Sequence, residues 1–363
     1  MKMITLLLLL PIAATAQKNY LLVGTYTGAG SEGIYVYNFD EATAETSLVS
    51  TAKASNPSYL AISPDQKFVY AVNENEQGSV SAFRFEKGKL TLINQQPSQG
   101  AHPCYVDVDK TGKWLAVGNY SSGTFAVLQI NSDGSLQSDG SFVQHRGSSI
   151  TDRQKGPHVH CTLFSPDNEI LFVSDLGTDG LYAYPFDETT GKLQKESVTV
   201  TKEKAGAGPR HFIINDEGKY AYLVHELSGT VSSFRYDNGK LERRQDISSL
   251  PDGYTGKFTS ADIHLSKDGK FLYTTNRDDL NQITIFKVLP DGTLQRVGFK
   301  STLGKPPRNF SIDPSGKFLL VAHQNSNDVV IFRINAETGL LTDTGKRISV
   351  SKPVCLKWIR SDK

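Results

Sequence analysis

Residues Ser63–Glu74 read SPDQKFVYAVNE, a turn followed by an apolar strand, and this pattern recurs along the chain. The matching segments are DKTGKWLAVGNY from Asp109, SPDNEILFVSDL from Ser165, NDEGKYAYLVHE from Asn215, SKDGKFLYTTNR from Ser266 and DPSGKFLLVAHQ from Asp313. Their first residues are 46, 56, 50, 51 and 47 positions apart. Repeats of roughly 40–50 residues built from short strands are typical of β-propeller blades.

Each unit has room for four antiparallel strands. In the unit that begins at Asn56 they read PSYLAIS, KFVYAVNE, GSVSAFRFE and KLTLINQ, with glycine-containing turns that suit hairpins. The apolar residues show no helical periodicity, which argues against helical repeat proteins such as TPR and HEAT arrays. The sequence therefore predicts an all-β propeller with four strands per blade.

The two ends of the chain each supply part of a further blade. LLVGTY (Leu21–Tyr26) matches the second strand LAVGNY (Leu115–Tyr120), and PVCLKWI (Pro353–Ile359) matches the first strand PSYLAIS. Together with the six internal units, these halves predict seven blades, with the terminal strands sharing one blade. Such closure removes free sheet edges. An open β-solenoid is the alternative, but it would need polar capping repeats.

The first residues resemble a signal peptide: Lys2 precedes the apolar run Ile4–Ala13, and Ala14-Thr15-Ala16 is a cleavage site. The run is about half the ~20 residues that a membrane span requires. We therefore expect export of residues 17–363 to the periplasm or the extracellular space, with no membrane span. A net charge of +1 gives no indication of nucleic-acid binding.

Three columns of the repeat place polar residues where a blade pattern calls for apolar ones. Five positions before each turn stand Ser58, Cys104, His160, Arg210, Ala261 and Arg308. Ten positions after it stand Asn73, Asn119, Asp175, His225, Asn276 and His323, and eleven after it Glu74, Tyr120, Leu176, Glu226, Arg277 and Gln324. Because the first strand begins where the second ends, we expect all three columns at one face of the disc, around a funnel that binds a polar ligand.

The charged members of these columns suggest an anionic ligand. Arg210, Arg277 and Arg308 would repel one another across a cavity unless anions neutralise their charges. Glu74 and Glu226 could neutralise two of them, and a bound carboxylate or phosphate could neutralise the remaining charge. The alternative is a closed network of internal salt bridges. For the histidines, the alternative is hydrogen bonding that joins one blade to the next.

We predict no metal or other cofactor. His158 and His160 lie two apart on one strand and could share a face, but a zinc site needs a third ligand, such as His225 or Glu226, for which spacing gives no evidence. The three cysteines, Cys104, Cys161 and Cys355, show no CxxC spacing and are interpreted as small buried residues.

At these residues the sequence resembles the seven-bladed lactonase propellers, which include propeller-type 6-phosphogluconolactonases and carboxy-cis,cis-muconate cyclases. The matching segments are RQKGPHVHCTLFSPD (Arg153–Asp167), FVSDLGTDGLYAY (Phe172–Tyr184), GAGPRHFIINDEGKYAYLVHEL (Gly206–Leu227), TTNRDDLNQITIF (Thr274–Phe286) and PPRNFSIDPSGKFLLVAHQNSNDVVIF (Pro306–Phe332). The resemblance implies a catalytic His at His158 or His160, together with Arg210, Glu226 and Arg277. The remaining substrate-binding candidates are Glu74, His102, Asp175, His211, His225, Arg308 and His323.

The resemblance implies hydrolysis of a small sugar lactone. From the residue types we predict a metal-independent reaction, with a histidine as general base and arginines that stabilise the substrate anion and the oxyanion. A non-catalytic carbohydrate-binding propeller and a lactonising cycloisomerase stay open as alternatives. The family's phosphorylated substrate is cytoplasmic, whereas this chain carries an export signal, so the substrate is also open. Both a monomer and a homodimer are compatible with the sequence.

Overall fold

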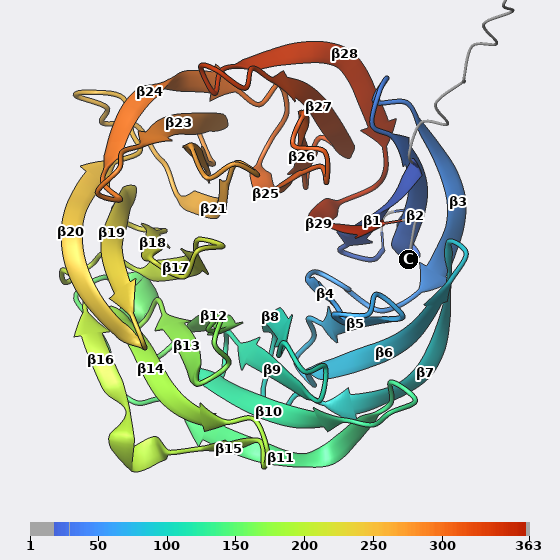
Figure 1. Cartoon of the computed structure of the whole chain (residues 1–363), viewed down its shortest axis with the longest axis vertical. Coiled ribbons are helices and arrows are strands. Elements are labelled where there is room, and N and C mark those ends of the chain that lie inside the picture. Colours follow the sequence, from blue (N-terminus) through green and yellow to red (C-terminus); the bar gives the residue numbers. More distant parts are fainter. Residues whose placement is uncertain (1–17, 29, 361–363) are drawn as a thin grey trace, which may run out of the picture.

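The computed structural model describes residues 18–28 and 30–360, so the predicted signal peptide at residues 1–16 lies outside the described residues. Seven antiparallel sheets stand around a central axis like the blades of a propeller (Figure 1). The prediction of a seven-bladed all-β propeller is confirmed. Over the described residues, no helix has the length and apolar character needed to cross a membrane.

The closing blade contains both ends of the chain. Its strands, from the axis outward, are β29 (Pro353–Arg360), β1 (Lys18–Thr25), β2 (Gly33–Asp40) and β3 (Thr46–Lys53). β1 and β29 pair antiparallel, with Leu22 opposite Lys357, and they lie side by side in Figure 1. The predicted closure by complementary terminal strands is therefore confirmed.

The next three blades follow in chain order, each from its inner to its outer strand. The first consists of β4 (Leu60–Ile62), β5 (Phe68–Asn73), β6 (Ser79–Glu86) and β7 (Lys89–Pro97). The second consists of β8 (Pro103–Val108), β9 (Trp114–Asn119), β10 (Thr124–Ile130) and β11 (Leu136–Gln144). The third consists of β12 (Val159–Phe164), β13 (Ile170–Asp175) and β14 (Gly180–Asp187), followed by β15 (Lys192–Leu193) and β16 (Thr199–Lys202), which both pair with β14.

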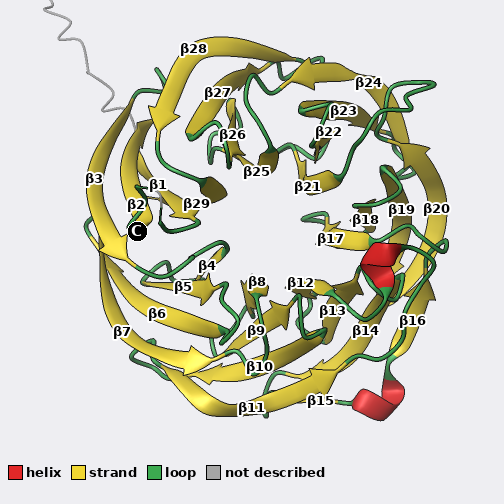
Figure 2. Ribbon diagram, turned by 180° about the vertical axis from the view of Figure 1, so that it is seen from behind, coloured by secondary structure: helices red, strands yellow, loops and turns green. Residues whose placement is uncertain are grey.

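The last three blades complete the ring. The fourth internal blade consists of β17 (Pro209–Ile214), β18 (Tyr220–His225), β19 (Thr230–Asp237) and β20 (Lys240–Ser248). The fifth consists of β21 (Ser260–Leu265), β22 (Phe271–Asn276), β23 (Gln282–Val288) and β24 (Leu294–Ser301). The sixth consists of β25 (Pro307–Ile312), β26 (Phe318–His323), β27 (Asp328–Ile334) and β28 (Leu341–Ser349). Two 3-10 turns, η1 (Asp152–Gln154) before β12 and η2 (Lys195–Ser197) between β15 and β16, are red in Figure 2.

The turn between the first and second strands of each internal blade explains the recurring Asp-Gly-Lys pattern. The fourth residue of this turn has a left-handed backbone in every case, with φ from 60° to 78°; these residues are Gln66, Gly112, Asn168, Gly218, Gly269 and Gly316. Glycine and asparagine tolerate this conformation best. The turn residues therefore set the position at which each second strand begins.

Apolar side chains of the inner and middle strands form the core between neighbouring blades. All six residues of β5, β9, β22 and β26 are buried, whereas the outer strand β28 mixes buried residues with residues exposed to solvent. These second strands are therefore packed against neighbouring blades on both of their faces. Side chains at their ends are thus held on a fixed frame around the axis.

Candidate active site

Two of the three polar columns meet in one cavity of about 380 Å³ at a mouth of the central channel. Its lining combines the starts of first strands with the residues that follow second strands: Tyr26, Glu74, Cys104, Tyr120, Arg153, His160, Glu226, Thr259, Arg277, Asp278 and Arg308. A groove of equal volume between the turns after β17 and β21 is lined by turn residues such as Asp216 and Asp268 and contains no arginine.

Glu226 is the centre of the charged cluster in this cavity. Its Oε2 lies 2.8 Å from Arg210 Nε, and its Oε1 lies 2.8 Å from Arg153 Nη1 and 3.1 Å from Arg277 Nη2. Burial opposes ionisation of this carboxyl, but Arg277 and Arg210 outweigh it and hold the pKa of Glu226 well below 4.5. Glu226 is therefore a fixed anion.

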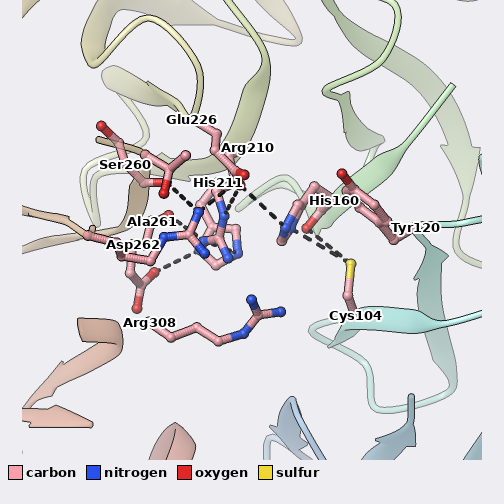
Figure 3. Close-up of polar contacts among 12 residues, drawn as sticks. Cys104, Tyr120, His160, Arg210, His211, Glu226, Ser260, Ala261, Asp262 and Arg308 are labelled. Carbon is pink, nitrogen blue, oxygen red and sulfur yellow. Dashed lines mark hydrogen bonds and ion pairs between the residues drawn. The ribbon is translucent and has the colours of Figure 1, made fainter. Parts of the chain in front are cut away.

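Arg210 faces Glu226 and two further acceptors (Figure 3). Its Nη1 donates to the carbonyl of Ala261 and, over 3.2 Å, to His211 Nε2. His211 then donates from Nδ1 to Asp262 Oδ1 over 2.7 Å, and burial together with Arg210 lowers the pKa of His211 to about 4. Arg210 and His211 are thus occupied by protein partners and hold Glu226 in place.

His160 is the histidine that lines the cavity. Its Nδ1 lies 3.7 Å from Cys104 Sγ, and its Nε2 lies 3.9 Å from Glu226 Oε2, which exceeds a normal hydrogen bond. Burial, reinforced by the positive charge of Arg210, lowers the pKa of His160 well below 6.5. The imidazole is therefore neutral at neutral pH and able to accept a proton.

His158 lies outside the residues that line the cavity. Its ring stacks on Tyr120 with centroids 4.4 Å apart, its Nδ1 donates to the Tyr120 carbonyl over 2.9 Å, and its backbone N–H donates to Asp175. A bulge between Val159 and Cys161 interrupts the regular alternation of side chains, and although both imidazole rings contact Tyr120, only that of His160 lines the cavity. Within the described parts of the chain, no three His, Cys, Asp or Glu side chains converge as metal ligands.

Arg308 enters the cavity opposite Glu226 (Figure 3). Its Nη2 lies 4.0 Å from Glu74 Oε2, and its guanidinium lies 5.5 Å from the centre of the Tyr26 ring. Glu74 Oε2 accepts hydrogen bonds from Ser58 Oγ and, over 2.8 Å, from Tyr26 Oη. Among the described residues, the Arg308 guanidinium donates no hydrogen bond, so its five N–H groups are available to a ligand.

The sequence model of one protein family, described as "Lactonase, 7-bladed beta-propeller", matches residues 20–358. The chain belongs to this lactonase family. It is 37% identical to a 6-phosphogluconolactonase of Formosa agariphila, covering 91% of this chain and 97% of the relative, and 36% identical to a 6-phosphogluconolactonase of Bacillus subtilis, covering 93% and 97%. The solved structure of the Pseudomonas aeruginosa periplasmic gluconolactonase PpgL superposes with a TM-score of 0.90 at 37% identity, covering 94% of this chain and 99% of that one. The family resemblance and the enzyme class, a carboxylic ester hydrolase acting on lactones, are confirmed.

The column ten positions after each turn does not line the cavity of this lactonase. Successive residues of a strand point to opposite sides, so these side chains turn into their own blades while the next residue faces the channel. Asp175 bonds His145 Nδ1 at 2.8 Å, His225 Nε2 lies 2.8 Å from Ser232 Oγ, and His323 Nδ1 lies 2.9 Å from Asp328 Oδ1. His102 also lies outside the lining, where its backbone N–H donates to the Asn75 carbonyl.

Several residues of the lactonase cavity were not predicted as site residues. The two lining columns include Tyr26, Tyr120 and Cys104, so the register of the repeat could have identified these three residues. Thr259 and Asp278 flank Ser260 and Arg277 and are joined by a hydrogen bond of 2.7 Å. Arg153 belongs to no column; it lies in extra residues that lengthen one repeat spacing to 56.

Proposed function

We propose that this protein hydrolyses a sugar lactone, with His160 as general base and Arg308 as the main group that stabilises the oxyanion. The carrying observation is that a neutral histidine and an arginine without hydrogen-bond partners share the deep end of one cavity. Both also line the small void beneath it, together with Cys104. The names of the relatives, 6-phosphogluconolactonase and gluconolactonase, support the substrate class.

In this proposal, His160 removes a proton from a water molecule as its oxygen attacks the lactone carbonyl. The carbonyl oxygen gains negative charge, which Arg308 and the neighbouring Arg277 stabilise. The ring C–O bond then breaks, and the protonated His160 returns its proton to the departing ring oxygen. Lactone and water thus become an open-chain hydroxy acid.

Glu226 and Arg210 have a supporting role in this scheme. Glu226 is held ionised by three guanidinium groups, so it does not exchange protons near neutral pH. Arg210, with 2% of its side chain exposed, is out of reach of a substrate. We infer that Glu226 fixes Arg277, and that Arg210 adds to the effect of burial in keeping the pKa of His160 low.

The test is hydrolysis of gluconolactone and 6-phosphogluconolactone by purified protein, followed as acid release and repeated with a chelator. We expect turnover of at least one lactone, unaffected by chelator, and a loss of about 100-fold or more in kcat for His160→Gln and Arg308→Ala. Absence of turnover on both lactones, or wild-type rates in both variants, would refute the proposal; loss with chelator would refute its metal independence.

Export of the protein belongs to the same proposal. The segment that resembles a signal peptide supports it, as does the word periplasmic in the name of the Pseudomonas aeruginosa relative. Fractionation of cells, with N-terminal sequencing of the mature protein, tests it: we expect a chain that begins at Gln17 outside the cytoplasm. A cytoplasmic chain that retains residues 1–16 would contradict it.

A further inference from the structure

Arg153 differs from the other guanidinium groups of the cavity in its origin. Arg210, Arg277 and Arg308 lie on or directly beside strands of the blades, whereas Arg153 lies in η1, within the connection from β11 to β12. This connection accounts for the longest spacing in the repeat, 56 residues. Insertions into a repeat protein form loops on one face, which is often the binding face.

Arg153 is also the guanidinium most accessible to a ligand. Its side chain is 46% exposed, compared with 19% for Arg308, 12% for Arg277 and 2% for Arg210. His160 and Arg308 line the deep end of the cavity, so Arg153 stands at the outer end. A substrate whose carbonyl lies at His160 would therefore extend its remote end toward Arg153.

Glu226, the carboxylate partner of Arg153, also has two other guanidinium partners. Arg153 bonds Glu226 Oε1 at 2.8 Å and Tyr120 Oη at 2.8 Å. However, Arg210 and Arg277 already pair with the same carboxylate, one on each oxygen. Three guanidinium groups, those of Arg153, Arg210 and Arg277, therefore share the single carboxylate of Glu226, and this cluster has more positive than negative charge.

The backbone beneath Arg153 is held firmly, although its side chain is half-exposed. The next residue, Gln154, is completely buried and donates from Nε2 to the Leu176 carbonyl and to Asp179 Oδ1, both over 2.8 Å. A long side chain on a fixed base can exchange one partner for another without moving the loop. It therefore presents its planar fork to an oxyanion at a defined place.

We infer that Arg153 is the specificity-determining residue for an anionic substituent, such as a phosphate ester, on the part of the lactone remote from its carbonyl. On binding, its guanidinium exchanges Glu226 and Tyr120 for two oxygens of that group. The inference rests on the proposed lactonase function. No covalent step is involved, and Arg153 contacts the substrate without contacting the reacting carbonyl.

The test compares Arg153→Ala with Lys155→Ala, which removes a positive charge from the same loop at a side chain 78% exposed that pairs with Asp152. We expect Arg153→Ala to raise KM for 6-phosphogluconolactone by about tenfold or more, the usual cost of one charge-assisted pair. KM for gluconolactone and kcat for both lactones should change less than threefold. The Lys155→Ala variant should match wild type on both. An equal effect of Arg153→Ala on both lactones, a fall in kcat, or no effect would overturn the inference.

A binding measurement separates this inference from the proposed function. If wild-type protein turned over neither lactone, the proposed function would fail, and calorimetric titration with 6-phosphogluconate and gluconate would still report on Arg153. We expect wild type to prefer the phosphorylated acid and Arg153→Ala to lose that preference. Equal affinities of wild type for the two acids, or a preference that Arg153→Ala retains, would overturn the inference.

Discussion

Arg210 Nε lies 2.8 Å from Glu226 Oε2, and both side chains are almost completely buried in the wall of the cavity. Arg210 lies on β17 and Glu226 follows β18, so a single hairpin carries the pair. The loss of one member of a buried ion pair leaves the other charged and unpaired, which costs more than the pair contributes. This relationship makes Glu226 the residue on which the cavity depends most.

Glu226→Gln should therefore destabilise the protein while preserving side-chain volume. We expect a loss of roughly 3–5 kcal/mol in the free energy of unfolding, because three guanidinium groups would lose their anion. Urea denaturation measures it, with Glu217→Gln in an exposed turn as the control, expected within about 0.5 kcal/mol of wild type. Equal stability of the two variants would contradict the ion-pair account.

Substitution of the two histidines of the PHVH segment should have different effects on kcat/KM. We expect His160→Gln to lower kcat/KM about 100-fold or more, as removal of a general base does, and His158→Gln to lower it less than tenfold. The difference arises because His160 lines the cavity while His158 is bonded to the Tyr120 carbonyl. Steady-state kinetics on a lactone substrate measure both, and the reverse order would exclude His160 as the base.

The pH profile should reflect the environment of His160. A general base must be unprotonated, so kcat/KM should fall as pH decreases through the pKa of His160. Burial and Arg210 lower that pKa well below 6.5, so the acid limb should lie below pH 6.5. The initial rate of acid release at several pH values, corrected for spontaneous hydrolysis, measures it; a midpoint at or above pH 6.5 would contradict the assignment.

Stability should also depend on a histidine outside the cavity. Burial, together with Arg243, lowers the pKa of His225 to about 3, against an ordinary 6.5. Above pH 6.5 neither the folded nor the unfolded state is protonated there, so folding carries no penalty; between pH 6.5 and about 3 only the unfolded state gains the proton, and stability falls.

His225→Asn tests this dependence with a residue that the repeat itself uses, since Asn73, Asn119 and Asn276 occupy the equivalent position. We expect the melting temperature of wild type to fall more between pH 7 and pH 5 than that of His225→Asn. Thermal denaturation at both pH values measures the difference. An equal or larger fall in the variant would show that His225 does not contribute.

The repeated turn should be sensitive to its left-handed residue. Gly269 has φ 69°, and an added Cβ would meet no atom within 4 Å, so Gly269→Ala tests backbone strain alone. We expect a loss of about 1–2 kcal/mol. Gly156→Ala is the matched control, because its Cβ would also meet no atom within 4 Å and its φ lies outside the left-handed region. Chemical denaturation that ranks the two equally would contradict this reason.

Two adjacent columns of the repeat, those that contain His225 and Glu226, lie in different surroundings in the structure. His225 and Glu226 are neighbours in sequence, and the register alone places both at the same end of a blade. The pleat of the strand turns His225 toward Ser232 and Glu226 toward three arginines. The alternation rule predicts that only one of two adjacent columns faces the channel, and the structure shows which.

The positions of His160 and Arg153 in the cavity could not be predicted from the sequence alone. His158 and His160 have the spacing of residues on one face, but a bulge removes that equivalence, and bulges depend on strand pairing rather than on local pattern. Arg153 belongs to no repeat position, and only its long-range contacts with Glu226 and Tyr120 bring it to the cavity.

The sequence by itself determined the number of blades, the strand order and the closure of the ring by β1 and β29. These follow from turns and apolar strands, which are local patterns repeated in register, together with the need to pair every sheet edge. Only the tertiary structure decided which polar residues are free for a ligand. Arg210 is hydrogen-bonded to Glu226, Ala261 and His211, whereas the N–H groups of the Arg308 guanidinium have no hydrogen-bond acceptor among the described residues. That choice depends on the direction of each side chain and on partners from other blades, which no local pattern specifies.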